Sequence, residues 1–445
     1  MLAHLPEAVT ADLDAAVAAA QRDWKSPGLS AGLVRGGSLV WSAHVGHARL
    51  DPPTPPQDDT QYLMGSVTKT FVAVAVLRLR DEGRLGLRDR LGRFLPETRH
   101  SELQIRDLLS HSSGLQREPV GRIWESLSAP TREELIAGLE EAEAVLDPHR
   151  AWHYSNLAYA LLGDVVEKVT GQPWEAVVRE RVLDPLGMGS TSTMPDDSRA
   201  AIGYHVHPYA GTARPEPRIA LNATASLGGL WTSVADLARY AAFIADPDER
   251  VLRPDTLEEM CRPVIMRDDA WTGAHGLGFM AGRIGERILV GHSGGMPGYV
   301  TGLRVHRPSG VGAVVFANST SGSAPMALAG QLVTTVLDAL PEPVEPWVPE
   351  DPNPAVAPLL GPWWSEGTEF VFEVREGRLW SRVVGSKADD ARYEQVDDAT
   401  WRVDEGRELG ERLEVVFDET GAVARMYLAT YAVTRDPRGF GDLLT

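Results

Sequence analysis

The sequence predicts an α/β (α+β) fold, in which helices flank a sheet and a helical subdomain is inserted, followed by a small antiparallel β domain. Strand patterns at 30–45 and 287–317 enclose a long stretch of helical patterns. A Pro-rich run at 341–358 has the composition of a stiff linker. Short alternating strands follow it. We therefore expect an enzyme-sized domain at 1–340 and a β domain at 359–445.

The N-terminal quarter supplies a helix, a hairpin and a second helix. Residues 11–24 place apolar side chains on one helical face, and 30–45 read as two strands joined at the Gly36-Gly37 turn. Residues 66–82 are rich in Ala, Val and Leu and stop at Gly83, which predicts a strong helix with a glycine end.

The middle of the chain is helical, and strands return near residue 287. Ser233 begins a helix, with Asp236 placed as in a capping box. Because strands occur at both ends of this segment, we expect one sheet that combines them. The other predicted elements are helices at 156–170, 174–183 and 324–339, and strands at 287–291, 302–306 and 311–317.

Beyond the linker, short apolar alternations separated by turn residues predict an antiparallel sheet. The predicted strands are 369–374, 379–384, 400–404, 413–417 and 422–428.

Composition limits the functions that this chain can have. Its 445 residues are 43% hydrophobic and 24% charged, and the formal net charge is −19, which disfavours nucleic acid and anionic membrane as partners. The single cysteine, Cys261, cannot form an intramolecular disulfide and has the context of an inert buried thiol. The sequence shows neither a signal-peptide pattern nor a long apolar run, so we expect a soluble, cytoplasmic protein that needs no cofactor.

Ser66-Val-Thr-Lys69 begins the strong helix, and the i, i+3 spacing places both side chains on one face. A helix N-terminus offers free N–H groups and a partial positive charge, which favour an alkoxide or an oxyanion. A buried Lys with a lowered pKa can accept the Ser proton. By itself this spacing also fits an N-cap Ser followed by a solvated Lys.

Two further motifs give this pair a context. Tyr154-Ser155-Asn156 precedes a helix, where a Tyr can shuttle protons and an Asn can hold a Lys and a substrate amide. Gly291-His-Ser-Gly-Gly295 follows a strand and can present a backbone N–H and an imidazole to a substrate. Each motif alone is an ordinary loop.

Together and in this order, the three motifs resemble the serine penicillin-binding fold, and specifically its branch of class C β-lactamases, D,D-carboxypeptidases, D-aminopeptidases, esterases and thioesterases. The resemblance extends over roughly residues 25 to 340. Stretches that also resemble this branch are 107–115, 159–170, 185–188 and 228–237.

The resemblance implies a role for each motif residue. Ser66 is the nucleophile, and Lys69 and Tyr154 share the base and leaving-group acid roles, with coupled titrations. Asn156 orients the substrate and Lys69. The backbone N–H groups of Ser66 and Gly295 form the oxyanion hole, with Gly294 beside them. No metal is implied. The terminal β domain resembles the small barrel-like domains of some D-aminopeptidases and penicillin-binding-type thioesterases, in which such a domain can shape the site, and a loop at Trp363-Trp364 is the candidate for that role here.

His292 departs from the Lys common in the third motif. Lys would hold a substrate carboxylate as a fixed cation, whereas His is mostly neutral near pH 7. This departure disfavours β-lactamase and carboxypeptidase activity and favours esters, amides, D-peptides or thioesters. We expect His292 to meet a carbonyl, amide or ester oxygen.

Other motifs have competing interpretations. Gly291-x-Ser293-x-Gly295 matches the nucleophile elbow of α/β-hydrolases, but that elbow needs a helix after the Ser. His205 and His207 suggest a metal pair but lack a third ligand in register. We interpret His111 as a structural residue that holds a loop through side-chain-to-backbone bonds. Residues considered for an acyl pocket are Trp152, Trp231, Tyr204 and Tyr209.

The sequence therefore predicts a serine hydrolase that acts through an acyl-Ser66 intermediate on an ester, amide or D-amino-acid peptide. The alternatives are an acyl-transferase or a cyclising thioesterase, which would release a peptide from a carrier protein, and a non-catalytic scaffold on this fold. The catalytic residues alone do not separate hydrolysis from acyl transfer.

Overall fold

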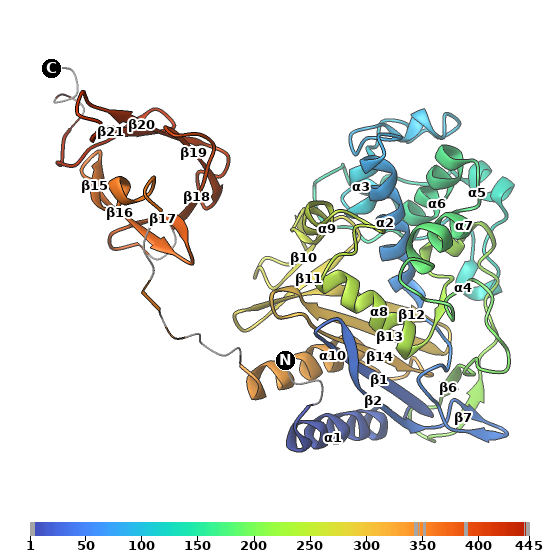
Figure 1. The fold of residues 1–445 in the computed structure, drawn as a ribbon. Helices are drawn as coiled ribbons and strands as arrows, with labels where there is room; N and C mark the ends of the chain where they lie inside the picture. The colour runs from blue at the N-terminus through green and yellow to red at the C-terminus, as the bar shows by residue number, and fades with distance from the viewer. Residues whose placement is uncertain are drawn as a thin grey trace. The chain divides into compact units, whose positions relative to one another are not determined.

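The computed structural model describes residues 5–341, 346, 348–349, 353–386, 390–439 and 441. The chain divides into two compact units, Met1–Glu342 and Pro343–Thr445. Figure 1 shows the elements of each unit, which are described separately below. Much of the predicted linker at 341–358 lies outside the described residues.

One antiparallel sheet of eight strands forms the base of the first unit, and it combines strands from both ends of that unit. Strand β1 pairs with β14, with Leu29 opposite Ala317, so residues far apart in sequence become neighbours. This confirms the predicted sheet. The order is β2 (Ser38–Gly46), β1 (Gly28–Arg35), β14 (Val311–Ala317), β13 (Tyr299–His306), β12 (Arg287–Met296), β11 (Met280–Ile284), β10 (Gly273–His275) and β9 (Ile265–Met266).

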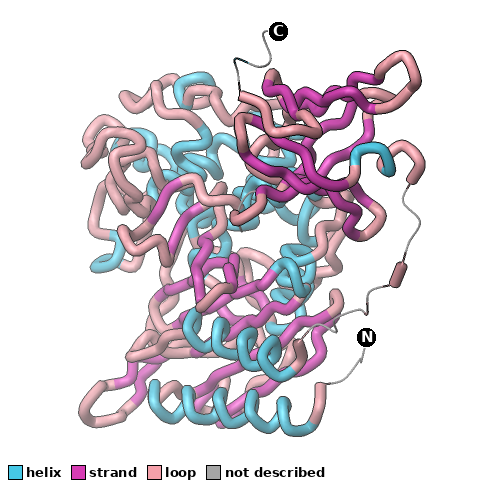
Figure 2. The backbone as a smooth tube through the Cα atoms, turned by 90° about the vertical axis from the view of Figure 1, so that its left-hand side faces the viewer, coloured by secondary structure: helices cyan, strands magenta, loops and turns pink. Residues whose placement is uncertain are grey.

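Helices cover both faces of this sheet. Helices α1 (Glu7–Trp24) and α10 (Pro325–Ala339) pack side by side on one face, as Figures 1 and 2 show. Their apolar stripes share a core with the facing side chains of β1 and β14. Helix α8 (Val234–Ala245) packs on the other face, where a larger core extends into the helical region. Because successive side chains of a strand point to opposite faces, the sheet contributes side chains to two separate hydrophobic cores.

The helical region between the outer strands is built around α2 (Thr68–Asp81), whose residues from Thr68 to Leu77 are all buried. A helix that is buried on every side over this stretch must lie inside a core. Figure 1 shows α2 among the other helices, beside the sheet. The other helices of this region are α3 (Ile105–Leu109), α4 (Ile123–Ser126), α5 (Arg132–Gly138), α6 (Asn156–Thr170), α7 (Trp174–Val178) and α9 (Pro254–Cys261).

Short strand pairs complete the described part of the first unit and brace its loops. One of them joins the segment before Ser66 to a distant loop, because β5 pairs with β8 with Leu63 opposite Trp231. These strands are β3 (Arg49–Leu50), β4 (Pro53–Thr54), β5 (Tyr62–Leu63), β6 (Tyr204–Val206), β7 (Ala213–Pro215) and β8 (Trp231–Thr232).

Some predicted details are wrong. The helix predicted at 174–183 changes to a π-turn at Arg179–Leu183. Ser233 caps α8 by accepting the Asp236 N–H, but the Asp236 carboxylate does not complete a capping box. It accepts instead from the Ser190 N–H and the Thr191 hydroxyl, because a buried carboxylate needs donors and the neighbouring loop supplies them. Strands β9, β10 and β11 were not predicted.

Cys261 lies at the end of α9 and is buried, and burial raises its thiol pKa to about 12. A thiol of this kind is not a nucleophile near neutral pH, which confirms its interpretation as an inert side chain. Among the described helices, we find none with the length and apolar character that crossing a membrane would require.

The second unit is one antiparallel sheet of eight strands in sequence order, and it is nearly closed into a barrel by a bridge between Trp364 and Thr434. Its core is its own. The strands are β15 (Gly361–Ser365), β16 (Thr368–Arg375), β17 (Arg378–Val383), β18 (Ala391–Gln395), β19 (Thr400–Glu405), β20 (Arg412–Phe417), β21 (Val423–Leu428) and β22 (Tyr431–Val433).

The five strands predicted here are present, and β15, β18 and β22 are additional. Trp363 and Trp364 do not form a loop. They belong to β15, and Trp363 is fully buried and donates its indole N–H to the Leu359 carbonyl. The alternation of one large ring inward and one outward is that of a strand.

The separate cores predict that the first unit folds without the second. Removing residues 345–445 should leave a protein with one cooperative unfolding transition, because no described side chain of the β unit belongs to either core of the first unit. Thermal unfolding followed by circular dichroism checks this. An insoluble or molten truncated protein would show that the barrel completes the fold of the first unit.

Candidate active site

Ser66 lies in a single 3₁₀ turn, Gly65–Val67, directly before α2, and Lys69 lies in the first turn of that helix. Their spacing brings Lys69 Nζ to 3.0 Å from Ser66 Oγ. Lys69 Nζ also donates to the Leu227 carbonyl at 2.5 Å. The predicted pair is therefore in hydrogen-bond contact, and the amine is anchored from a second side.

The Lys69 side chain is completely buried, and this burial lowers its pKa well below the usual 10.5. Glu118 opposes the shift and Arg117 adds to it. Desolvation dominates because the charged amine loses its water and gains no salt bridge at contact distance. A neutral amine beside a Ser hydroxyl is able to accept its proton.

Tyr154 ends the loop before α6. Lys69 Nζ is 5.1 Å from the centre of the Tyr154 ring, and a hydrogen bond links the Tyr154 hydroxyl with Ser66. Burial raises the Tyr154 pKa above 10, and the Ser66 bond only partly offsets this. The phenol therefore keeps its proton at neutral pH, which suits an acid or a proton shuttle more than a resting base.

Strand β12 approaches the Ser66 turn so closely that only glycine fits. A Cβ on Gly294 would lie 1.9 Å from the Met64 carbonyl oxygen, and a Cβ on Gly65 would lie 2.7 Å from the Gly295 nitrogen. Gly65 also has φ of +56°, which favours glycine. Ser66 and Gly295 line one cavity. This geometry agrees with the expected pair of oxyanion N–H donors, whose assignment stays a prediction.

Asn156 lines the same cavity but does not hold Lys69. Its Nδ2 donates to both carboxylate oxygens of Glu118, at 2.8 and 3.0 Å, while its Oδ1 is buried without a partner. Asn156 Oδ1 is the atom that would accept from the Lys69 amine, and it makes no such contact, so the expected Asn156–Lys69 bond is absent from this geometry. Lys69 is anchored by the Leu227 carbonyl instead.

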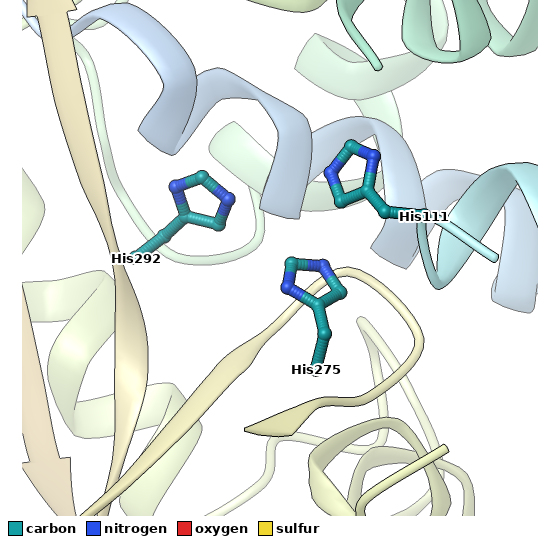
Figure 3. A group of neighbouring side chains, drawn as sticks. All are labelled: His111, His275 and His292. Atoms are coloured by element: carbon teal, nitrogen blue, oxygen red, sulfur yellow. The ribbon is translucent and has the colours of Figure 1, made fainter. Parts of the chain in front are cut away.

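His292 lies in β12 but does not face the substrate cavity. It is fully buried and absent from the cavity lining, and its Nδ1 bonds the Ser293 carbonyl at 2.6 Å. Burial lowers its pKa to about 3, so the ring is neutral. The imidazole faces His111 and His275, as Figure 3 shows. A direct contact with a substrate oxygen, which the motif had suggested, therefore has no support in this geometry.

The cavity above Ser66 has a volume of about 360 Å³. Of the four aromatic residues considered for it, only Trp152 is present. Trp231 lines a second cavity, Tyr204 is buried, and Tyr209 is 93% exposed. The lining is Ser66, Arg117, Glu118, Trp124, Trp152, Tyr154, Asn156, Leu227, Met280, Ser293, Gly295 and Met296.

Sequence reasoning missed Arg117, Glu118, Trp124, Leu227, Met280 and Met296. Arg117 and Glu118 lie just after the 107–115 stretch, which was the only available signal for them. Arg117 lies over the Tyr154 ring at 5.0 Å and pairs with Glu118 at 3.4 Å. The cavity thus has a charged rim beside aromatic walls.

The 110–118 segment supports the Tyr154 loop. His111 Nδ1 accepts the Ser155 N–H at 3.1 Å, and the His111 carbonyl accepts the His153 N–H. Ser155 Oγ donates to the Gln116 carbonyl. The interpretation of His111 as a residue that holds a loop is confirmed.

Two competing interpretations fail. Ser293 lies within β12, which continues to Met296 and turns into β13, so the strand–turn–helix of a nucleophile elbow is absent around it. His205 lies in β6 and faces Glu216 at 3.8 Å. Among the described residues, the group suited to metal binding is instead His111, His275 and His292, with ring nitrogens within 4.8 Å of one another.

Comparisons with known proteins agree with this geometry. The family model "Beta-lactamase" matches residues 13–338, and a "Domain of unknown function (DUF7586)" matches residues 352–435. Esterase EstB of Burkholderia gladioli is 35% identical over 47% of this chain and 56% of its own length. Beta-lactamase-like protein 2 of Dictyostelium discoideum is 29% identical over 63% of this chain, and the match spans only 54% of that protein.

Among solved structures, an octameric penicillin-binding protein homologue from Pyrococcus abyssi aligns with a TM-score of 0.67 over 95% of this chain and 99% of its own, at 24% identity. That likeness shows the fold. Penicillin-binding proteins and D-amino acid amidases also occur among the similar proteins. The chain belongs to the Beta-lactamase family of serine hydrolases, which includes penicillin-binding proteins and esterases.

Proposed function

We propose that this protein is a serine hydrolase that forms an acyl intermediate on Ser66. The observation that carries the proposal is the contact of Ser66 Oγ with a fully buried amine of lowered pKa, at the floor of a cavity. A structural Lys has no reason to be held neutral, since a surface position would keep it solvated at no cost.

In the proposed reaction, Ser66 Oγ attacks an acyl carbonyl carbon and its proton passes to Lys69 Nζ. The N–H groups of Ser66 and Gly295 stabilise the oxyanion. Tyr154 protonates the leaving group as the carbonyl re-forms, and the proton held on Lys69 Nζ then passes to the Tyr154 phenolate. Water then hydrolyses the acyl-Ser66 ester by the reverse proton path.

The cavity supports a small acyl group on an ester, amide or D-amino-acid peptide. Trp124, Trp152 and Met280 give it apolar walls, and its volume suits a group of amino-acid size. Among the described residues that line the cavity, Arg117 is the one with a positive charge, and its ion pair with Glu118 partly neutralises that charge. A substrate carboxylate therefore meets no unpaired fixed charge in the described lining.

Ser66→Ala should abolish turnover and leave the fold intact, because the turn before α2 lacks a side-chain cap from Ser66 and only the nucleophile is lost. Intact mass after incubation with activated D- and L-acyl esters should show an acyl adduct on the wild type and none on this variant. Ser293→Ala is the matched control and should still acylate. Acylation that needs Ser293 and not Ser66 would overturn the assignment.

Lys69 and Tyr154 should behave as one catalytic unit, because both contact Ser66. Lys69→Met and Tyr154→Phe should each lower kcat/KM by roughly three powers of ten, and the double variant by little more. Multiplicative losses would show separate proton paths.

The pH profile provides the control. The neutral amine is the active form, so wild-type kcat/KM should rise with pH, and burial should place the midpoint well below 10.5. Lys69→Arg stays protonated and should be inactive at every pH.

Masking a substrate's terminal carboxylate as an amide should leave kcat/KM near pH 7.5 unchanged or higher, and penicillins should acylate slowly. The reason is that His292 is buried outside the cavity and Arg117 is paired. Matched free-acid and amide substrates measure this.

Arg117→Gln is the control variant for this comparison. It should change the ratio of free-acid to amide kcat/KM by less than about threefold. A large wild-type preference for the free acid that Arg117→Gln removes would show that Arg117 binds the carboxylate.

The partition of the acyl-enzyme between water and added amines separates hydrolysis from acyl transfer. We expect water to be the main acceptor at millimolar amine, because the cavity opens to solvent through the exposed Arg117 side chain. A dominant aminolysis product would favour the acyl-transferase alternative.

A further inference from the structure

Three histidines from three separate segments meet directly behind the catalytic groups. His111 comes from the loop after α3, His275 from β10 and His292 from β12, and all three are fully buried. Figure 3 shows their rings turned toward one another. Four of their ring nitrogens have no hydrogen-bond partner: His111 Nε2, His292 Nε2 and both nitrogens of His275. Buried polar atoms of this kind need partners.

The outer two rings have their tautomers fixed by the backbone. His111 Nδ1 accepts the Ser155 N–H at 3.1 Å, so its lone pair is used and the ring proton is on Nε2. His292 Nδ1 lies 2.6 Å from the Ser293 carbonyl oxygen, which can only accept. Nδ1 therefore carries the proton of His292, and its Nε2 is an acceptor.

We propose that His275 links these two rings into one directed hydrogen-bond chain. It runs from the Ser155 N–H through His111, His275 and His292 to the Ser293 carbonyl. His111 Nε2–H donates toward one nitrogen of His275, and the other nitrogen of His275 donates toward His292 Nε2. One nitrogen of each ring lies within 4.8 Å of one nitrogen of each of the other two rings, and bridging waters or small ring rotations would complete the two links of the chain. The direction of the chain is the same in both cases.

A divalent metal would suit the separation of these nitrogens but not their second contacts. A metal-bound His donates its other N–H to an oxygen acceptor. His292 meets this condition at Ser293, whereas His111 does not, because its Nδ1 faces a donor. Coordination through His111 Nε2 would need to break the Ser155 bond that holds the Tyr154 loop.

The charge around the cluster agrees with three neutral rings. Burial is the main cause that lowers the pKa of all three histidines. In a chain of neutral imidazoles each ring offers one donor and one acceptor, which the proposed order uses completely.

The chain makes His275 a positioning residue. It ties the loop that carries Tyr154 to the strand that carries Gly295, and the His111 ring packs against Tyr154 with ring centres 4.3 Å apart. Loss of the link should let Tyr154 move relative to Ser66. This kinetic consequence rests on the proposed function, whereas the tautomers do not.

Selective ¹⁵N-histidine labelling of the full chain tests the network directly. Long-range ¹H–¹⁵N correlation at pH 7.5 should show His111 as the Nε2–H tautomer and His292 as the Nδ1–H tautomer, with signals assigned by single His→Gln variants. Addition of Zn²⁺ should leave them unshifted. A protonated ring, the opposite tautomer of His111, or stoichiometric Zn²⁺ binding that is lost in the variants would overturn the proposal.

Variants of His275 supply the second test. His275→Leu fills space without hydrogen bonding, and should lower kcat about tenfold with little change in KM, because Tyr154 loses its orientation and the cavity is unchanged. His275→Gln offers a donor and an acceptor and should recover activity to within about threefold. Equal losses in both variants would show a packing role only. If the His275→Leu variant does not fold, the tautomers measured on the wild-type protein still test the proposal.

Discussion

Keeping the Lys69 amine uncharged is the constraint around which the rest of the first unit is arranged. Desolvation is expensive for a charged amine, so a Lys completely removed from solvent prefers its neutral form, with its remaining polar contacts supplied by the protein. The Leu227 carbonyl and Ser66 Oγ are those contacts. Both groups belong to tight turns of the backbone. They hold the amine in place, but neither carries a negative charge that would stabilise its protonated form.

The surroundings of Lys69 depend on the close packing of α2 and of the turn before it. Helix α2 packs against α6 and α7, and the Ser66 turn lies against β12. A side chain at Gly65 or Gly294 would push the strand away from the turn. The same close approach brings the Gly295 backbone near the turn, which is the arrangement expected for the proposed oxyanion donors.

Charges near the site are held at its rim. Glu118 pairs with Arg117 and fixes the Asn156 amide, while the histidines behind Tyr154 stay neutral. A carboxylate at contact distance from Lys69 would raise the amine pKa and weaken it as a base. The segment at 110–118 thus has two roles, since its backbone holds the Tyr154 loop and its last residues set the polarity of the cavity mouth.

The sequence by itself determined the main helices, most strands of the large sheet and the residues that are candidates for the reaction. Apolar periodicity gave α6 at its observed bounds, strand β14 and the buried α2, and the Ser66–Lys69 spacing brought both groups together because one helical turn is a local structure. A change in strand pattern predicted a further antiparallel sheet but not its near closure, which depends on the Trp364–Thr434 bridge. Only the tertiary structure decided where Asn156 and His292 point, because each choice depends on a partner distant in sequence: Glu118 for the amide, and His111 and His275 for the imidazole. Side-chain direction in a crowded site is set by competition among such donors and acceptors, and a linear sequence does not show which of them are near.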